Sequence, residues 1–157
     1  AYTELREVTA AACADCPFRG QTQSKESPVN ASAAAAVIFG VVALGAVGFQ
    51  LALAAGAPWG AYAMGGKYPG RFPAPMRVAA VVQALILVGL TGVVLARAGV
   101  ALEAWGSAAS WLIWVAVGFS AVSLLLNSIT TSKLERLVWV PVAVVMLASS
   151  LAVGLLG

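Results

Sequence analysis

Histidine is absent from this 157-residue sequence, and charged side chains make up only 10 % of it. Haem and zinc sites usually need histidine ligands, so its absence argues against both, and we expect no metal or other cofactor. The two cysteines could supply only half of a four-thiolate site. Soluble domains carry about 25 % charged residues, so the shortage of charge also argues against a water-soluble fold.

What the sequence has instead is long apolar runs. Hydrophobic residues make up 61 % of it, and the mean hydropathy is +0.94. Four uncharged runs cover residues 33–55, 78–96, 108–126 and 138–156. Each can cross a hydrocarbon core of about 30 Å, and none shows the polar face that a soluble bundle needs. Residues 31–157 therefore predict an all-α fold, a four-transmembrane-helix bundle made of two helical hairpins.

The first 30 residues differ from the rest, and we expect a polar, largely disordered N-terminal tail there. Cys13 and Cys16 stand in a C-x-x-C spacing, which could form a small disulfide loop, a redox dithiol or half of a metal site. Quinone-linked membrane thiol oxidoreductases are also four-helix bundles with such a pair. This pair lies well before the first span and has no second pair to relay electrons, so we expect no catalytic role for it.

Basic residues near the spans predict the orientation. Lys67, Arg71 and Arg77 lie in the first connector, and Lys133 and Arg136 lie in the third. Because cytoplasmic loops carry an excess of Lys and Arg, connectors one and three are expected in the cytoplasm. We therefore expect a protein of the bacterial cytoplasmic membrane with both termini extracytoplasmic.

The first connector, GAPWGAYAMGGKYPGRFPAPMR over residues 56–77, is rich in glycine, proline and aromatic residues. It lacks the pattern of a phosphate-binding loop. Trp59 is expected at the headgroup boundary, and Lys67, Arg71 and Arg77 are expected to meet anionic lipid. We interpret this stretch as a connector and lipid anchor; the alternative is a lid over a ligand.

Polar residues within the spans gather at similar depths on the connector side. They are Gln50, Gln83, Ser120, Ser123 and Asn127. An amide in hydrocarbon needs a partner, so we expect Gln50 and Gln83 to face the bundle interior and to hydrogen-bond there as interhelical glue. A small polar cavity is the alternative interpretation.

Ser132-Lys133-Leu134-Glu135 fits a capping box. In this motif the serine oxygen accepts from the third helical amide, and the glutamate reaches back to the backbone of the cap. The fourth helix is therefore predicted to begin at Lys133.

Several motifs occur in a characteristic order: LALAAGAPWG, then AMGG, PG and FPAPMRV, and much later NSITTSKLERLVWVPVAVV. In this pattern residues 33–157 resemble an uncharacterised family of small bacterial four-helix integral membrane proteins. The resemblance implies a topology but no activity. It leaves out the tail, and so implies nothing for Cys13 and Cys16.

These observations favour a non-enzymatic accessory or interaction module in the lipid bilayer. Its partners would be other membrane proteins or further copies of itself, and no nucleic acid is expected. The first alternative is a membrane thiol-disulfide oxidoreductase that uses Cys13 and Cys16. A facilitator of a small neutral solute ranks below both.

Overall fold

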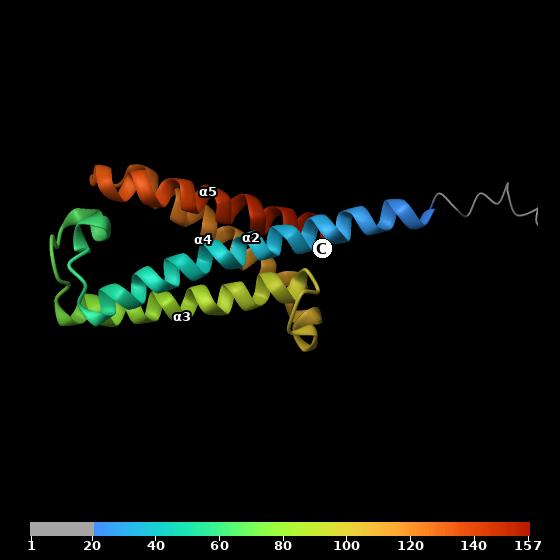
Figure 1. The fold of residues 1–157 in the computed structure, drawn as a ribbon, viewed down its shortest axis with the longest axis horizontal. Helices are drawn as coiled ribbons and strands as arrows, with labels where there is room; N and C mark the ends of the chain where they lie inside the picture. The colour runs from blue at the N-terminus through green and yellow to red at the C-terminus, as the bar shows by residue number, and fades with distance from the viewer. Residues whose placement is uncertain (1–20) are drawn as a thin grey trace, which may run out of the picture.

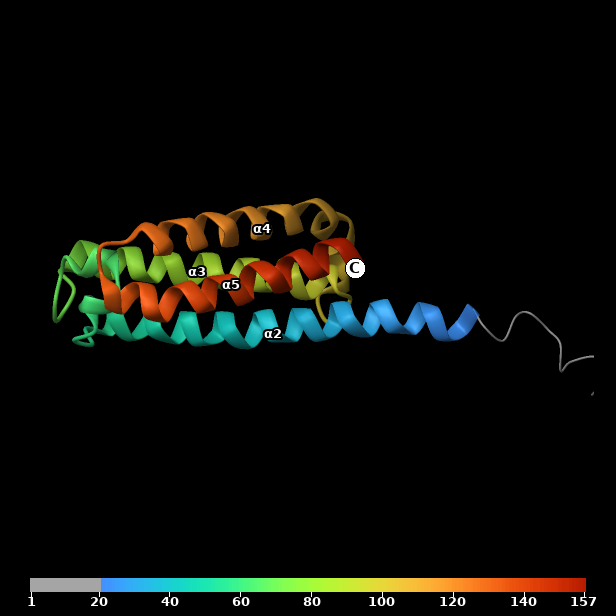
Figure 2. The same cartoon turned by 90° about the horizontal axis from the view of Figure 1, so that it is seen from above.

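Four long helices make up most of the computed structural model, which describes residues 21–157. They are α2 (Gln21–Ala55), α3 (Ala74–Arg97), α4 (Gly106–Ile129) and α5 (Lys133–Leu156), and they run side by side (Figure 1, Figure 2). No strand occurs in this part of the chain. All four helices are long and apolar enough to cross a membrane, which confirms the predicted all-α four-helix fold.

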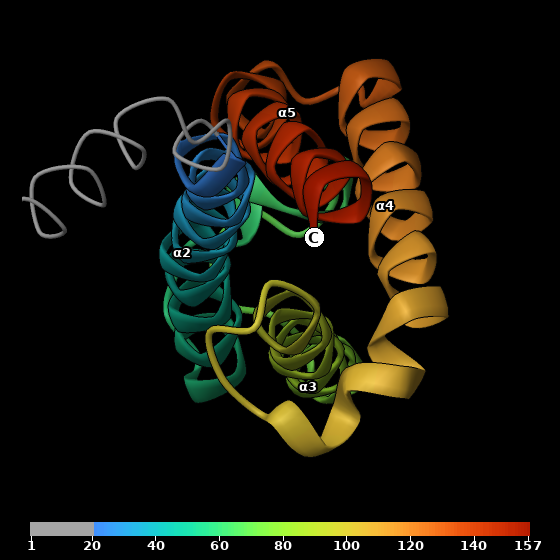
Figure 3. The same ribbon diagram turned by 90° about the vertical axis from the view of Figure 1, so that its right-hand side faces the viewer.

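Seen along its length, the bundle is a ring in which α2, α3, α4 and α5 follow one another (Figure 3). Residues 56–73 join α2 to α3, and residues 130–132 join α4 to α5 at the same end, here called the connector end (Figure 1). Residues 98–105 join α3 to α4 at the opposite end and include a short 3₁₀ helix, η4 (Glu103–Trp105). The arrangement consists of two helical hairpins packed on each other.

The helices are longer than the predicted spans, most of all at the start of α2. Its described part starts with Gln21, so residues 21–30, which we assigned to a largely disordered tail, are helical. Adding a residue to an existing helix costs little, and Gln, Lys and Glu are good helix formers, so a spanning helix can extend into polar sequence. The part of α2 that is apolar enough to span runs over Val29–Ala55. Cys13 and Cys16 lie outside the described residues.

Small residues and a few large ones fill the centre of the bundle. Ala36, Phe39, Ala43, Ile113 and Val153 are fully buried and belong to one cluster. The outward faces are apolar too: the large side chains with more than two thirds of their surface exposed include Leu44, Leu137 and Leu155 at 71 %, 75 % and 72 %. An apolar exterior of this kind indicates lipid as the surrounding solvent.

The long connector is folded rather than extended. It contains the 3₁₀ turns η2 (Gly60–Tyr62) and η3 (Met64–Gly66), and Gly60 N donates to Gly70 O at 2.9 Å. Phe72 is buried in a small cluster with Leu53 and Ala80, where the connector meets α2 and α3. The connector therefore has a defined shape that closes against the end of the bundle.

Candidate binding cavity

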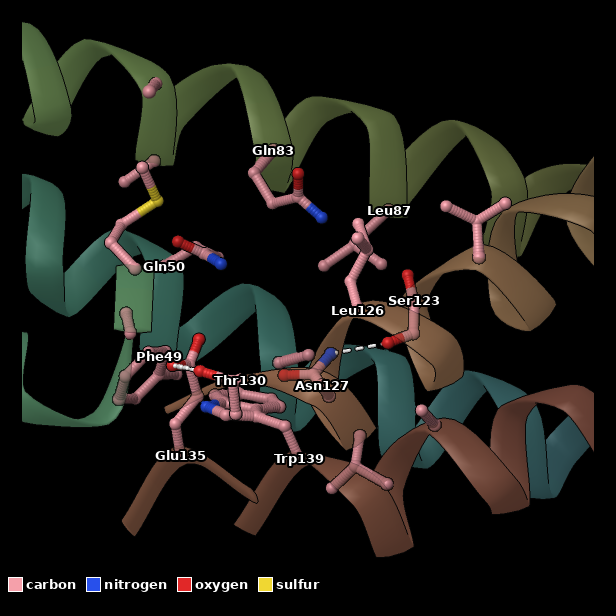
Figure 4. Close-up of a pocket in the computed structure, with 18 of the residues that line it drawn as sticks. Phe49, Gln50, Gln83, Leu87, Ser123, Leu126, Asn127, Thr130, Glu135 and Trp139 are labelled. Carbon is pink, nitrogen blue, oxygen red and sulfur yellow. Dashed lines mark hydrogen bonds between the residues drawn. The ribbon is translucent and has the colours of Figure 1, made fainter. Parts of the chain in front are cut away.

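A cavity of about 500 Å³ lies inside the bundle near the connector end (Figure 4). All four helices and the connector contribute to its wall. Sites for small molecules commonly enclose about 300–1,000 Å³ and combine an apolar lining with a few polar groups. The size and composition of this cavity fit that description.

The five polar residues singled out in the sequence all line this cavity. Gln50 comes from α2, Gln83 from α3, and Ser120, Ser123 and Asn127 from α4. Because the five residues lie at similar depths on three helices, they line the same cavity. The sequence could not show whether that volume would be packed or open.

Gln50 and Gln83 point into the cavity from two neighbouring helices (Figure 4). Both side chains are half-buried. We expected them to hydrogen-bond as interhelical glue, but within residues 21–157 neither side chain has a hydrogen-bond partner. Each amide carries two N–H donors and an acceptor oxygen. The two glutamines therefore offer unused hydrogen-bonding capacity to whatever occupies the cavity.

Two of the three polar side chains of α4 behave differently, because their own helix provides a partner, whereas Ser123 Oγ has none among the described residues. Ser120 Oγ donates to Ala116 O at 2.9 Å, and Asn127 Nδ2 donates to Ser123 O at 2.7 Å. Such bonds to a carbonyl one turn earlier are common for short polar side chains in helices. They leave the two glutamines and the Ser123 hydroxyl as the more available polar groups.

Glu135 is a cavity residue that the sequence interpretation missed. The predicted start of the helix at Lys133 is confirmed, and Ser132 Oγ accepts from Glu135 N at 3.3 Å as a capping box requires. The other half of that prediction is wrong, because the carboxylate does not reach back to the cap. Its Oε2 accepts instead from Gly65 N at 2.7 Å and from Thr130 Oγ1, also at 2.7 Å; the second bond is drawn in Figure 4.

Two sequence features could have pointed to Glu135. It is the acidic residue of the third connector, and the glycine-rich connector at the same end contains turns whose N–H groups need acceptors. A carboxylate near a set of free backbone donors is a natural acceptor. The capping motif predicted a local partner for the Glu135 carboxylate. In the structure the carboxylate contacts Gly65 instead, seventy positions away.

Further hydrogen bonds hold the connector on the start of α5. Trp139 Nε1 donates to Tyr62 O at 2.8 Å, and Ser132 Oγ donates to Ala61 O at 3.2 Å. Gly65 from the same segment lies at the cavity wall. The connector thus covers the end of the cavity, in the position of the lid that we considered as an alternative.

The connector residues assigned to lipid contact lie on the surface. Trp59, Lys67, Arg71 and Arg77 are all exposed. Arg77 also has a structural contact, because its Nε donates to Ala54 O at 2.6 Å and so satisfies a carbonyl in the last turn of α2. Surface exposure leaves the charges of the three basic residues free to meet lipid headgroups.

The cavity reaches the outer surface of the bundle between α3 and α4. Ala79 of α3 and Val122 and Leu126 of α4 line it, and all three are exposed, as is the lining residue Met64 in the connector. Side chains that face both an interior volume and the exterior mark a mouth. Because the surrounding face is apolar, this mouth opens sideways toward lipid.

Comparison with known proteins adds no assignment: no family model, curated protein or solved structure matches this chain. The resemblance to small bacterial four-helix membrane proteins therefore stays a prediction. In the described part of the chain, no three His, Cys, Asp or Glu side chains are grouped so that they could hold a metal ion. What the cavity does is inferred from its own residues.

Proposed function

We propose that this protein is an integral membrane binding module, whose bundle holds one small, largely apolar molecule in the cavity beside Gln50 and Gln83. The observation that carries the proposal is that both amides face a cavity and lack partners among the described residues. A polar group out of water without a hydrogen bond costs about 1–3 kcal/mol. A ligand with a polar group that pairs with the amides would recover that cost.

The mouth between α3 and α4 supports a ligand that arrives from the bilayer. Ala79, Val122 and Leu126 surround the opening with apolar surface. A molecule dissolved among the lipid chains could pass them without crossing a polar barrier. The connector, held by Glu135 and Trp139, covers the end of the bundle axis, where its Met64 lines the cavity and is also exposed.

This proposal keeps the non-enzymatic character that the sequence favours and gives the module a ligand. The sequence interpretation ranked a solute facilitator last among three functions. The cavity is the reason that we now place small-molecule binding first. A bound molecule could in turn control contacts with other membrane proteins. The redox alternative depends on Cys13 and Cys16, outside the described residues, and remains a prediction.

We also propose the bacterial cytoplasmic membrane as the location, with the connector end in the cytoplasm, because its Lys67, Arg71 and Arg77 are exposed.

Photolabelling tests the proposal directly. The full chain is reconstituted into phosphatidylcholine vesicles and exposed to a decanol that carries a diazirine on its chain. After irradiation, the labelled positions are mapped by peptide mass spectrometry. We expect saturable label on cavity residues such as Met76, Gln83 and Met146, which unlabelled decanol displaces.

Two variants of α3 provide the matched controls. Gln83→Phe fills part of the cavity and should remove the saturable label, while Leu85→Phe, on a side chain that is 66 % exposed, should leave it unchanged. Label that stays on outward residues such as Leu44 and Leu85 and never saturates would refute the proposal. So would equal labelling of the two variants.

A further inference from the structure

Building on the proposed function, we propose that the molecule in the cavity is a lipophilic cation, an amine or ammonium compound whose charged end lies at Glu135. The inference concerns the class of ligand and rests on the electrostatics of the cavity wall. It goes beyond the neutral solute that the sequence suggested.

The cavity carries one negative charge and no positive one. Among the described residues that line it, Glu135 is the only one with an ionisable acidic or basic side chain. Its Oε2 is occupied by two uncharged donors, Gly65 N and Thr130 Oγ1, whereas its Oε1 has no partner in residues 21–157. A half-buried carboxylate with one free oxygen attracts a cation more strongly than it would in water.

The basic residues nearest in sequence leave that oxygen free. Lys133 and Arg136 are both exposed, and neither lines the cavity. Arg136 directs its Nη2 to Thr130 O, a carbonyl of the short α4–α5 connector. The place beside Glu135 Oε1 is therefore open to a charge supplied by the ligand.

Aromatic rings stand at the same end of the cavity. Phe49 and Trp139 line it beside Glu135 (Figure 4), with ring centroids 4.8 Å apart in an edge-to-face arrangement, and Phe49 also stacks on Trp59 at 6.0 Å. Cations bind over the faces of aromatic rings, and aromatic side chains next to a carboxylate are a common way to recognise ammonium groups. The Trp139 ring is fixed by its bond to Tyr62 O, so this wall is in place before a ligand binds.

The remainder of the cavity suits an apolar chain. Leu87, Leu126 and Met146 line the region away from Glu135. A phospholipid with an ammonium headgroup fits less well, because its phosphate would lack a cation among the cavity-lining residues described here. A simple amine with one hydrophobic tail matches the carboxylate, the rings and the apolar wall, and its several N–H donors can also be accepted by the oxygen of a glutamine amide.

Competition against the photoreactive decanol tests this inference. Decylammonium, decyltrimethylammonium, decanol and decanoate have chains of equal length and differ in the polar end. Each is titrated against the diazirine decanol on the full-length protein in phosphatidylcholine vesicles, and values are corrected for partition into protein-free vesicles. We expect the two cations to displace the label at concentrations about tenfold lower than decanol, because a contact with a charged group is stronger than a neutral one. Decanoate should compete more weakly than decanol.

Three variants, one of them a control, identify the residues that cause the preference for cations. Glu135→Gln should bring decylammonium to within about twofold of decanol, while Lys133→Gln, an exposed charge on the same turn, should leave the wild-type preference unchanged. Phe49→Leu should weaken decyltrimethylammonium more than decanol. The readout is a ratio within one variant: the concentration of cation that displaces the label, divided by that of decanol. A general loosening of the connector would change both concentrations and leave their ratio unchanged.

The outcomes separate this inference from the proposed function. Saturable labelling by diazirine decanol with no preference for cations, or with a preference for decanoate, would overturn the cation and leave the binding module standing. A cation preference that survives Glu135→Gln would overturn the role of this carboxylate. Absence of saturable labelling would reject the proposed function itself.

Discussion

Gly65 N donates a 2.7 Å hydrogen bond to Glu135 Oε2, which ties the first connector to the start of α5 across seventy positions of sequence. The same carboxylate accepts from Thr130 Oγ1, so one side chain joins both connectors at this end of the bundle. The end wall of the cavity depends on that junction.

Glu135→Ala should loosen the connector. Without the carboxylate, the part-buried Gly65 N loses its acceptor, which costs up to about 1–3 kcal/mol. We expect the unfolding free energy in mild detergent to fall by about 2 kcal/mol, and hydrogen exchange across residues 60–70 to become faster. Lys133→Ala, which removes an exposed charge two residues earlier, is the control and should change neither quantity by much. Unaltered exchange in Glu135→Ala would show that the connector holds its shape independently.

Gly60→Ala should disrupt the connector more severely. A Cβ at this position would stand 2.0 Å from Tyr68 O and 2.8 Å from Gly70 O, both backbone atoms that cannot turn aside. We expect a loss of stability of about 2 kcal/mol or more, measured by thermal unfolding in detergent.

Gly89→Ala in α3 is the matched control for that substitution, because a Cβ there meets nothing within 4 Å. Alanine is the better helix former by up to about 1 kcal/mol, so this variant should be neutral or slightly more stable. Equal destabilisation by the two substitutions would contradict the close packing around Gly60.

Gln50→Leu and Gln83→Leu distinguish glue from a binding site. If the amides held helices together, each substitution would cost stability. Because neither amide has a partner among the described residues and an unpaired amide out of water is itself costly, we expect the unfolding free energy of the ligand-free protein to stay unchanged or to rise by up to about 3 kcal/mol. Saturable labelling by diazirine decanol should nevertheless weaken. A loss of stability without a change in labelling would restore the interhelical role.

Cysteine labelling tests the orientation. Pro69→Cys, in a Cys13→Ser/Cys16→Ser background, places one thiol in the exposed connector without altering its charges. If the connector end is cytoplasmic, a membrane-impermeant maleimide should label this thiol only after cell lysis. Labelling of intact cells would reverse the orientation.

Hydropathy was sufficient to find the helices, because the length of each uncharged run is set by the thickness of the bilayer core. Their ends depended on local chemistry: Ser132 marked the start of α5 correctly. The helical structure of residues 21–30 in α2 was missed. A helix that extends into polar sequence shows no run of apolar residues there.

The cavity was harder to predict than the helices. Depth alone placed Gln50 and Gln83 near each other, but whether they met or faced open space depended on how α2 and α3 pack, which no local pattern encodes. The contact between Glu135 and Gly65 is of the same kind, since it requires two connectors to meet. Local motifs predicted the elements, and long-range packing determined the candidate site.

The most direct test of the account is to locate a ligand in the cavity. Crystals of the full-length protein grown with 10-bromodecanol, with data collected at the bromine edge, would give an anomalous peak at each bound bromine. We predict a peak inside the cavity bounded by Gln50, Gln83 and Leu126, and its loss in Gln83→Phe. Peaks confined to the outer faces of α3 and α4, with the cavity free of bromine, would contradict the claim that the bundle binds a molecule from the bilayer.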